Sequence, residues 1–195
     1  MVAEHGLSLS VDDALAHFRG GKMAEIVDQL EVWLGRSLPE SFVPSVRERT
    51  AEAFRIKLRP IEGAIDLVRA TTGPFCVASS GTPEKIRLSL SLTGLLPFFE
   101  GHIFSSYEVG FWKPDPGLFL HAARAMGVEP QECAVVEDSL PGIQAGVAAG
   151  MKVFAFQPNG VDPEIPSGVV IVKRLSDLQS ILGAGQSAGR DQPRI

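Results

Sequence analysis

The feature that most limits the folds open to this chain is the alternation, from residue 75 onward, of short apolar runs with segments of helical periodicity. The apolar runs, each predicted to be a buried strand, cover residues 75–78, 102–104, 134–136, 152–156 and 169–172. Helices are predicted between them, and two begin with Pro in the first position, after Thr82 and after Asp115. Strands that alternate with helices at this spacing predict an α/β fold with a doubly wound parallel sheet.

The N-terminal part of the chain differs from the rest because it contains no convincing strand. Helical periodicity covers residues 11–18, 22–34 and 39–58, and Ser10 with Asp13 forms a capping box before the first helix. We therefore predict a small all-helical unit over residues 1–59. An α/β core is predicted over residues 60–183, including short helices over residues 61–70 and 175–182. Residues 184–195 lack periodicity and predict a disordered tail.

Composition excludes several classes of partner. The net charge is −5 and no basic block occurs, so we expect no nucleic-acid partner. No apolar run approaches the roughly 18 residues that cross a bilayer, and the first residues lack signal-peptide features, so we expect no membrane partner. Cys76 and Cys133 fall in predicted strands without a zinc-type spacing, which is typical of a cytoplasmic protein. The sequence leaves the oligomeric state open.

Polar side chains follow the predicted strands, at the edge where open parallel sheets bind ligands. The segment Ser79-Ser80-Gly81 precedes a helix, an arrangement that binds phosphate oxygens but also occurs in ordinary helix caps. Lys113 lies just before a helix start stiffened by Pro, where it can neutralise a phosphoryl group or remain a solvated lysine. Both segments are candidates for phosphate binding, and a purely structural role stays open for each.

Two adjacent carboxylates, Glu137 and Asp138, follow the strand predicted over residues 134–136. Holding both at the end of a buried strand costs free energy unless a cation is bound. Mg²⁺ takes oxygen ligands, usually one or two carboxylates together with waters and a substrate phosphate. The pair therefore predicts a Mg²⁺ site, and the alternative is a helix N-cap at Asp138 or Ser139.

The helix predicted after these carboxylates carries a stripe of glycines. Gly142, Gly146 and Gly150 recur every fourth residue, so one face of the helix has no side chains. We interpret this stripe as structural, because it lets the helix approach the sheet closely.

The segments Ser79-Ser80-Gly81-Thr82, Lys113-Pro114-Asp115-Pro116 and Glu137-Asp138-Ser139 resemble, in order and spacing, three motifs of the haloacid-dehalogenase-like hydrolases. These are mostly Mg²⁺-dependent phosphatases. The stretch 112–123 is more narrowly similar to the branch that contains 6-phosphogluconate phosphatases and β-phosphoglucomutases. The resemblance implies the family's Rossmann-like core, and the helices of residues 1–59 are similar to its helical cap.

The resemblance also implies roles for the candidate residues. Ser79 would donate a hydrogen bond to a phosphoryl oxygen, and Lys113 would hold the nucleophile and the phosphate. Asp138, assisted by Glu137, would bind Mg²⁺.

The segment 18–22 is similar to the part of the family's cap that reads the substrate. Arg19 or Lys22 would meet a second anionic group there, such as a carboxylate. The implied partner is a small phosphorylated metabolite, and the alternative is an exposed basic break between two helices.

The sequence departs from the family at one point, because no Asp-x-Asp motif occurs in the 195 residues. In the family this motif ends the first strand and supplies the acid/base group, a metal ligand and the nucleophile that forms an aspartyl-phosphate. That strand lies between those that end here at Ser79 and Glu137, so its loss predicts two half-sheets with exposed apolar edges. We interpret the chain as an N-terminally truncated, inactive form of a Mg²⁺-dependent sugar phosphatase.

Other interpretations fit the retained motifs. One is a β-phosphoglucomutase-type phosphotransferase, and another is a non-catalytic protein that binds sugar phosphates or a protein partner. Asp12 and Asp13 are the nearby carboxylates that would replace the nucleophile, but their positions are typical of helix caps. A dehalogenase fits less well, because it needs no metal and the adjacent carboxylates indicate one.

Overall fold

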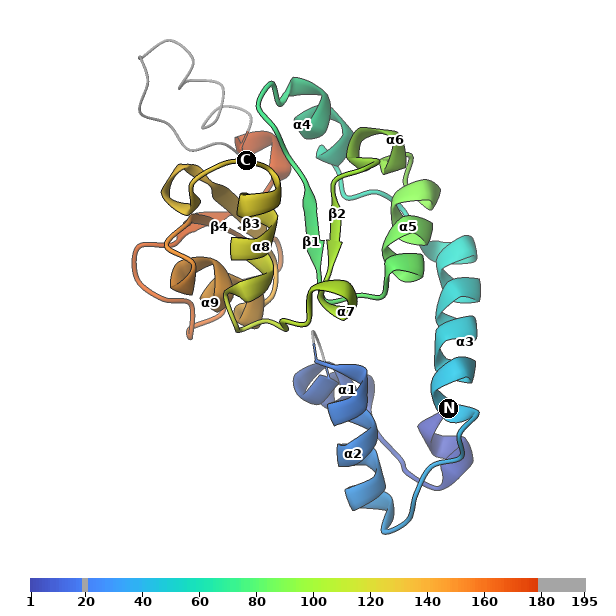
Figure 1. The fold of residues 1–195 in the computed structure, drawn as a ribbon. Helices are drawn as coiled ribbons and strands as arrows, with labels where there is room; N and C mark the ends of the chain where they lie inside the picture. Colours follow the sequence, from blue (N-terminus) through green and yellow to red (C-terminus); the bar gives the residue numbers. More distant parts are fainter. Residues whose placement is uncertain (19–20, 179–195) are drawn as a thin grey trace. The chain divides into compact units, whose positions relative to one another are not determined.

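The computed structural model describes residues 1–18 and 21–178, and Figure 1 shows the order of their helices and strands. The chain divides into two compact units, Met1–Leu58 and Arg59–Ile195. This division falls one residue before the boundary expected from the sequence. The tail predicted over residues 184–195 lies outside the described residues, as does the second half of the helix predicted over residues 175–182.

The regular elements among the described residues of the first unit are all helices. It contains the 3-10 helix η1 (Val2–His5) and the α-helices α1 (Val11–Phe18), α2 (Met23–Leu34) and α3 (Phe42–Lys57). The Ser10 hydroxyl donates to the Asp13 carboxylate at 2.6 Å and accepts from the Asp13 amide at 3.0 Å, which confirms the predicted capping box. Leu30 and Phe42 are buried, and the Phe42 ring meets His5 edge-on.

The second unit alternates strands with helices, as the sequence predicts. Its strands are β1 (Val77–Ser79), β2 (Ile103–Ser105), β3 (Ala134–Glu137), β4 (Lys152–Phe156) and β5 (Val170–Val172). Its helices are α4 (Ala64–Ala70), α5 (Pro83–Leu92), α6 (Leu96–Phe99), α7 (Ser106–Val109), α8 (Gly117–Ala125), η2 (Pro130–Glu132) and α9 (Leu140–Ala148). The short helices α6, α7 and η2 are not among the predicted elements, because so few residues show no helical periodicity.

The strands pair in parallel and form two separate sheets. β1 pairs with β2, with Ala78 opposite Phe104. The second sheet has the order β3-β4-β5, with Val135 opposite Val153. The parallel α/β fold is therefore confirmed, and its strands lie in two half-sheets rather than in one continuous sheet.

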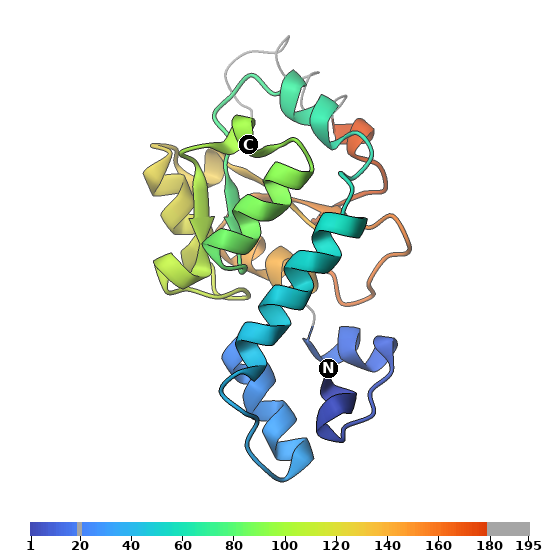
Figure 2. The same ribbon diagram turned by 90° about the vertical axis from the view of Figure 1, so that its right-hand side faces the viewer.

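Helices cover both faces of the strands, as expected of a doubly wound fold. Figure 2 shows α5 on one side of β1 and β2 and α8 on the opposite side. α9 packs over β3 and β4, and Gly146 makes this approach possible. A Cβ at this position would lie 2.8 Å from the Val153 side chain and 3.5 Å from Val135. The close packing predicted from the glycine stripe is thus confirmed at Gly146.

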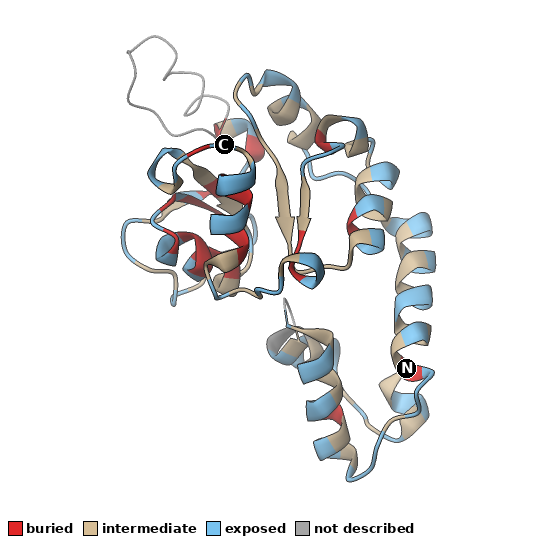
Figure 3. Cartoon of the chain, in the orientation of Figure 1, coloured by how far each residue is buried: buried red, intermediate tan, exposed pale blue. Residues whose placement is uncertain are grey.

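Burial is uneven between the two sheets. Figure 3 shows buried residues gathered around β3, β4 and α9, whereas β1 is of intermediate burial along its whole length. Val153, Phe154 and Ala155 of the central strand β4 are all buried, and Ile143 of α9 is fully buried. The main apolar core of the second unit therefore lies on the three-stranded sheet.

An apolar cavity of about 230 Å³ lies between the two sheets, and we call it the inter-sheet cavity. Ala78 of β1 and Cys76, which directly precedes β1, line one side of the cavity. Ala134 and Val136 of β3 line another. Phe119 of α8 also lines it. Among the described strands β1 pairs with β2 and β3 pairs with β4, so residues of two different sheets line this cavity.

The cysteines that line this cavity are free thiols and partly buried. Burial, together with the nearby Cys133, raises the pKa of Cys76 to about 11. Burial and the adjacent acidic side chains also raise the pKa of Cys133. Both groups are therefore thiols rather than thiolates at neutral pH.

Several predicted helix starts differ from the structure by one to three residues, and α3 begins at Phe42 rather than at residue 39. α4 begins at Ala64 rather than at residue 61, because Gly63 has a left-handed backbone with φ of 80°. α8 begins at Gly117 rather than directly after Asp115, with Pro116 at the N-cap. The Asp115 carboxylate still accepts from the Gly117 amide at 2.7 Å. Asp115 thus stabilises the turn before α8, although it lies one residue before the N-cap residue Pro116.

Among the helices of the described residues, none combines the length and the apolar composition that crossing a bilayer requires.

Candidate active site

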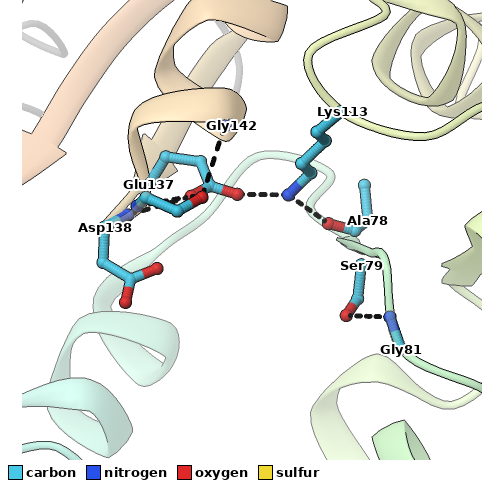
Figure 4. A network of polar contacts seen from close by, with 8 residues as sticks. Ala78, Ser79, Gly81, Lys113, Glu137, Asp138 and Gly142 are labelled. Carbon is cyan, nitrogen blue, oxygen red and sulfur yellow. Dashed lines mark hydrogen bonds and ion pairs between the residues drawn. The ribbon is translucent and has the colours of Figure 1, made fainter. Parts of the chain in front are cut away.

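The candidate residues of the second unit lie at the carboxyl ends of β1 and β3. Ser79 is the last residue of β1, and Glu137 is the last residue of β3. Lys113, from the loop between α7 and α8, joins the two strands, as Figure 4 shows. Its Nζ donates to the carbonyl oxygen of Ala78 at 3.2 Å and forms an ion pair with the Glu137 carboxylate. One side chain therefore bridges the carboxyl edges of the two sheets.

Lys113 lies in a nearly dry environment. Its side chain is 9% exposed, and that of its partner Glu137 is 10% exposed. The Nζ atom also lies 4.7 Å from the centre of the Phe119 ring, within the range of a cation–π contact. A buried ammonium is stable only when it is paired in this way. The alternative of a solvated lysine is therefore wrong.

Both carboxylate oxygens of Glu137 accept hydrogen bonds. Oε1 faces Lys113, while Oε2 accepts from the amides of Asp138 and Ser139, at 3.0 and 3.1 Å, and from the Ser139 hydroxyl at 2.9 Å. Gly142, in the first turn of α9, leaves space for this carboxylate, because a Cβ there would overlap it. The positive end of the α9 dipole favours a negative group at this position.

Asp138 lies beside Glu137 but in a different environment. Its side chain is exposed, and Figure 4 shows its carboxylate directed away from the carboxylate of Glu137. Its backbone is fixed, because its carbonyl oxygen accepts from the Gln157 side chain at 3.1 Å. The N-cap of α9 is Ser139, whose Oγ accepts from the Gly142 amide at 3.3 Å. The capping alternative is therefore confirmed for Ser139.

Hydroxyl groups order the loop that follows β1. Ser79 Oγ accepts from the Gly81 amide at 3.1 Å, and Thr82 caps α5 by accepting from the Lys85 amide at 3.4 Å. From the neighbouring strand β2, the fully buried Ser105 donates to the Gly81 carbonyl oxygen at 2.7 Å. These bonds fix a loop whose hydroxyl and amide groups are the candidate ligands for phosphate oxygens.

Three contributors to this site are not among the site residues predicted from the sequence, although Gly142 belongs to the predicted glycine stripe. Ser105 supports the loop after β1, the Ala78 carbonyl oxygen anchors Lys113, and Gly142 accommodates Glu137. Ser105 has a sequence signal, because the pair Ser105-Ser106 stands at the end of β2 just as Ser79-Ser80 stands at the end of β1. The Ala78 contact is made by the backbone, so its residue type carries no signal.

The carboxylates supply only part of a ligand set for a cation. No group of three or more His, Cys, Asp or Glu side chains is placed to hold a metal within residues 1–18 and 21–178. Glu137 is engaged by Lys113, whereas Asp138 offers an exposed carboxylate at the same edge. Mg²⁺ accepts one or two carboxylates and fills its remaining positions with water or substrate oxygens. The exposed carboxylate of Asp138 is of the type that Mg²⁺ takes as a ligand.

The structure brings most of the predicted site residues to one edge of the second unit: Ser79, Ser80, Gly81, Lys113, Glu137 and Asp138. Of the two residues predicted to read the substrate, Arg19 lies outside the described residues. Lys22 is the N-cap residue of α2 in the first unit. The roles of both stay predictions.

Several known proteins similar to this chain are phosphatases. A model of the haloacid dehalogenase-like hydrolase family matches residues 3–150. The chain is 39% identical over 157 residues to 6-phosphogluconate phosphatase of Escherichia coli strain K12. The matched residues cover 80% of this chain and 71% of that protein. It is 30% identical over 178 residues to hexitol phosphatase A of the same organism, which covers 89% of this chain and 80% of that protein. A conserved haloacid dehalogenase-like protein of unknown function from Agrobacterium tumefaciens superposes with a TM-score of 0.74 at 28% identity, over 95% of this chain and 87% of that one.

Proposed function

This chain belongs to the haloacid dehalogenase-like hydrolase family, and we propose that the protein is a phosphatase that acts on a small sugar phosphate. The phosphatases of Escherichia coli to which it is similar support this class of substrate. The observation that carries the proposal is the position of Lys113, whose buried ammonium bridges β1 and β3 beside Ser79. A fixed positive charge next to hydroxyl and amide donors is suited to a phosphoryl group.

Each residue of the site has a proposed role. The Ser79 hydroxyl, with Ser80 and Gly81, binds phosphoryl oxygens at the start of α5. Lys113 neutralises negative charge on the phosphoryl group and on the attacking carboxylate. Since phosphoryl transfer depends mainly on positioning and on charge neutralisation, these groups account for much of the expected catalysis.

We propose Mg²⁺ as the cofactor, with Asp138 as its ligand. When bound, the ion would neutralise phosphate charge and orient the substrate. Glu137 would assist by holding Lys113 and by fixing the backbone of Asp138 through the hydrogen bond from that residue's amide. The exposed Asp138 carboxylate and the fully engaged Glu137 carboxylate support this division of roles.

The proposed nucleophile is a carboxylate from a segment outside these 195 residues, because the chain contains no Asp-x-Asp motif. One oxygen of that carboxylate forms a bond to phosphorus, while the bond from phosphorus to the sugar oxygen breaks and the sugar oxygen takes a proton. Water then attacks the phosphorus of the aspartyl-phosphate, which releases inorganic phosphate and restores the carboxylate. The chain of 195 residues alone is therefore expected to be inactive.

A second candidate function is non-catalytic binding of a sugar phosphate. One observation favours it, because the candidate phosphate-binding groups are present in these 195 residues and the nucleophile motif is not. This function predicts that adding a strand with an Asp-x-Asp motif produces no turnover.

The test is an assay of phosphate release by a chain extended at its N-terminus with a strand that carries an Asp-x-Asp motif. We expect Mg²⁺-dependent release of phosphate from 6-phosphogluconate or a related sugar phosphate. Conversion of one phosphosugar into another without release of phosphate would instead indicate a β-phosphoglucomutase-type phosphotransferase. No turnover of any sugar phosphate would overturn the proposal.

The site residues are tested in the same extended chain. Lys113→Ala and Asp138→Ala are expected to lower kcat by roughly a hundredfold or more. The first variant removes the positive charge beside the phosphoryl group, and the second removes the proposed ligand of Mg²⁺. Lys173→Ala and Asp66→Ala are matched controls, because both residues are exposed. Equal activity of the site variants and these controls would contradict the site assignment.

A further inference from the structure

The backbone of Asp138, the proposed ligand of Mg²⁺, is held by hydrogen bonds on both sides of the residue. Its amide donates to Oε2 of the preceding Glu137 at 3.0 Å. Its carbonyl oxygen accepts from the side-chain amide of Gln157 at 3.1 Å. The first bond joins neighbours in the sequence, whereas the second joins residues 19 positions apart. The peptide groups before and after Asp138 are therefore both fixed, while its side chain is exposed.

Gln157 can hold Asp138 firmly because its own backbone is fixed to the sheet. It directly follows β4, whose last residue is Phe156. Its backbone amide donates to the carbonyl oxygen of Val172, the last residue of β5, at 2.8 Å. Its side chain, which is half-buried, reaches the residue that follows β3. Gln157 thus connects the carboxyl ends of all three strands of this sheet.

The register of the sheet explains why a glutamine suits this position. Glu137 of β3 lies opposite Ala155 of β4, so Asp138 and Gln157 lie just beyond this pair at the same edge. Neighbouring strands are about 4.8 Å apart, a gap that the long side chain of glutamine crosses. A carbonyl oxygen can only accept a hydrogen bond, so Gln157 must present its NH₂ group to Asp138.

The charges at this edge favour a neutral donor. Glu137 and Asp138 place two carboxylates next to each other, and a cation bound at Asp138 would lie close to the Gln157 side chain. A lysine in place of Gln157 would repel that cation, and an ionised glutamate has no hydrogen to donate. A glutamine holds the carbonyl oxygen of Asp138 without adding charge.

A fixed backbone matters for the ion proposed here. Mg²⁺ requires a near-ideal octahedral arrangement of its ligands, so a carboxylate on a mobile backbone would have to be ordered when the ion binds. Residues that orient a metal ligand without touching the metal typically change its affinity by about 10- to 100-fold.

We propose that Gln157 is a positioning residue for the metal, which raises the affinity of Asp138 for Mg²⁺ by holding its carbonyl oxygen. The inference rests on the proposed function, because it takes Asp138 as the ligand. Its role differs from that of Glu137, whose carboxylate also pairs with Lys113. Loss of the Gln157 side chain should therefore weaken metal binding and leave Lys113 in its place.

The experiment titrates the isotope-labelled chain of 195 residues with Mn²⁺, which takes the same oxygen ligands as Mg²⁺ and broadens nearby NMR signals. We expect broadening of the Asp138 and Ser139 amide signals, reversed by excess Mg²⁺. Gln157→Met should raise the Mn²⁺ concentration at half-broadening roughly tenfold. Gln144→Met is the matched control, because Gln144 is exposed on α9, and it should leave this concentration unchanged.

A second variant and a second measurement separate positioning from a merely structural role. Gln157→Asn keeps the amide but is one methylene shorter, so it should also weaken Mn²⁺ binding, and urea denaturation checks that each variant is folded. In the chain extended with an Asp-x-Asp strand, Gln157→Met should raise the Mg²⁺ concentration for half-maximal phosphate release roughly tenfold. Its kcat at saturating Mg²⁺ should stay within about twofold of the unmodified value. A lower kcat with an unchanged dependence on Mg²⁺ would contradict the proposed role.

The variant Asp138→Asn distinguishes failure of this inference from failure of the cofactor proposal. If Mn²⁺ broadens no signal near residue 138, or if Asp138→Asn leaves the broadening unchanged, both proposals are wrong. If Asp138→Asn abolishes the broadening while Gln157→Met responds to Mn²⁺ like the unmodified chain, Asp138 remains the ligand and only the role of Gln157 is overturned. Equal weakening in Gln144→Met and Gln157→Met would also overturn that role, because the effect would not depend on the contact with Asp138.

Discussion

The carboxylate of Glu137 fills the space that a Cβ at Gly142 would occupy. The first turn of α9 therefore lies directly against the end of β3, and its N-cap residue Ser139 donates its hydroxyl hydrogen to the same carboxylate. Glu137 in turn forms the ion pair with Lys113 that bridges the two sheets. Gly142 thus helps to position Lys113 indirectly, because it leaves space for the Glu137 carboxylate that pairs with Lys113.

Gly142→Ala is expected to displace the Glu137 carboxylate and to lower the free energy of unfolding by about 1–3 kcal/mol, as overpacking of a filled site does. Urea denaturation followed by circular dichroism measures this change. Gly73→Ala is the matched control, because a Cβ there meets no atom within 4 Å. Equal stability of the two variants would show that the space beside Glu137 is not restricted.

Glu137→Ala is expected to lower the free energy of unfolding by about 3 kcal/mol, because it leaves the ammonium of Lys113 buried without its partner. Asp138→Ala should change it by no more than about 0.5 kcal/mol, since the Asp138 side chain is exposed. Urea denaturation of the two neighbouring variants separates these roles. A larger loss in Asp138→Ala than in Glu137→Ala would contradict the assignment of Glu137 as the residue that positions Lys113.

Ser105→Ala should lower the free energy of unfolding by about 1–3 kcal/mol, because it leaves the Gly81 carbonyl oxygen and the Tyr107 amide without their hydrogen-bond partner. Hydrogen exchange at the loop after β1 should become faster as well. Ser91→Ala, at an exposed position of α5, is the control and should change neither quantity. Unchanged exchange at the loop would mean that Ser105 does not order the candidate phosphate-binding segment.

The raised pKa of Cys76 predicts a pH dependence of stability. Its thiol ionises at about 11 in the folded protein, against an ordinary value of 9.0. The contribution of the Cys76 thiol to the free energy of unfolding is therefore fully present below about pH 9. It is lost between about pH 9 and pH 11, because in that range the thiol ionises in the unfolded chain but not in the folded protein. Relative to Cys76→Ala, the unmodified chain should lose about 2 kcal/mol between about pH 8 and about pH 10.5. A difference that does not vary with pH would show that Cys76 is not shielded from water.

The sequence predicts the regular elements well, because their signals are local. Ser10 with Asp13 and Thr82 cap helices as their residue types indicate. The start of α4 is wrong because the conformation of Gly63 is set by its surroundings, which a residue pattern does not contain. The same holds for α8, where Asp115 stabilises the turn but the helix begins only at Gly117.

The glycine stripe and the paired carboxylates show why the site is harder to predict. Gly146 permits close packing on the sheet, Gly142 accommodates Glu137, and Gly150 ends the helix in a left-handed conformation. The three glycines, spaced four residues apart, are therefore each required for a different physical reason. The sequence also predicts a metal site from Glu137 and Asp138 without indicating that Lys113 would be the partner of Glu137, since that contact joins residues 24 positions apart.

The most direct test of the account compares phosphate release by the chain of 195 residues with release by the same chain extended with an Asp-x-Asp strand, both with Mg²⁺ and 6-phosphogluconate. The account predicts no release by the first chain and release by the second that Lys113→Ala abolishes. Release by the chain of 195 residues that Asp138→Ala abolishes would contradict it, because the nucleophile would then lie within these residues.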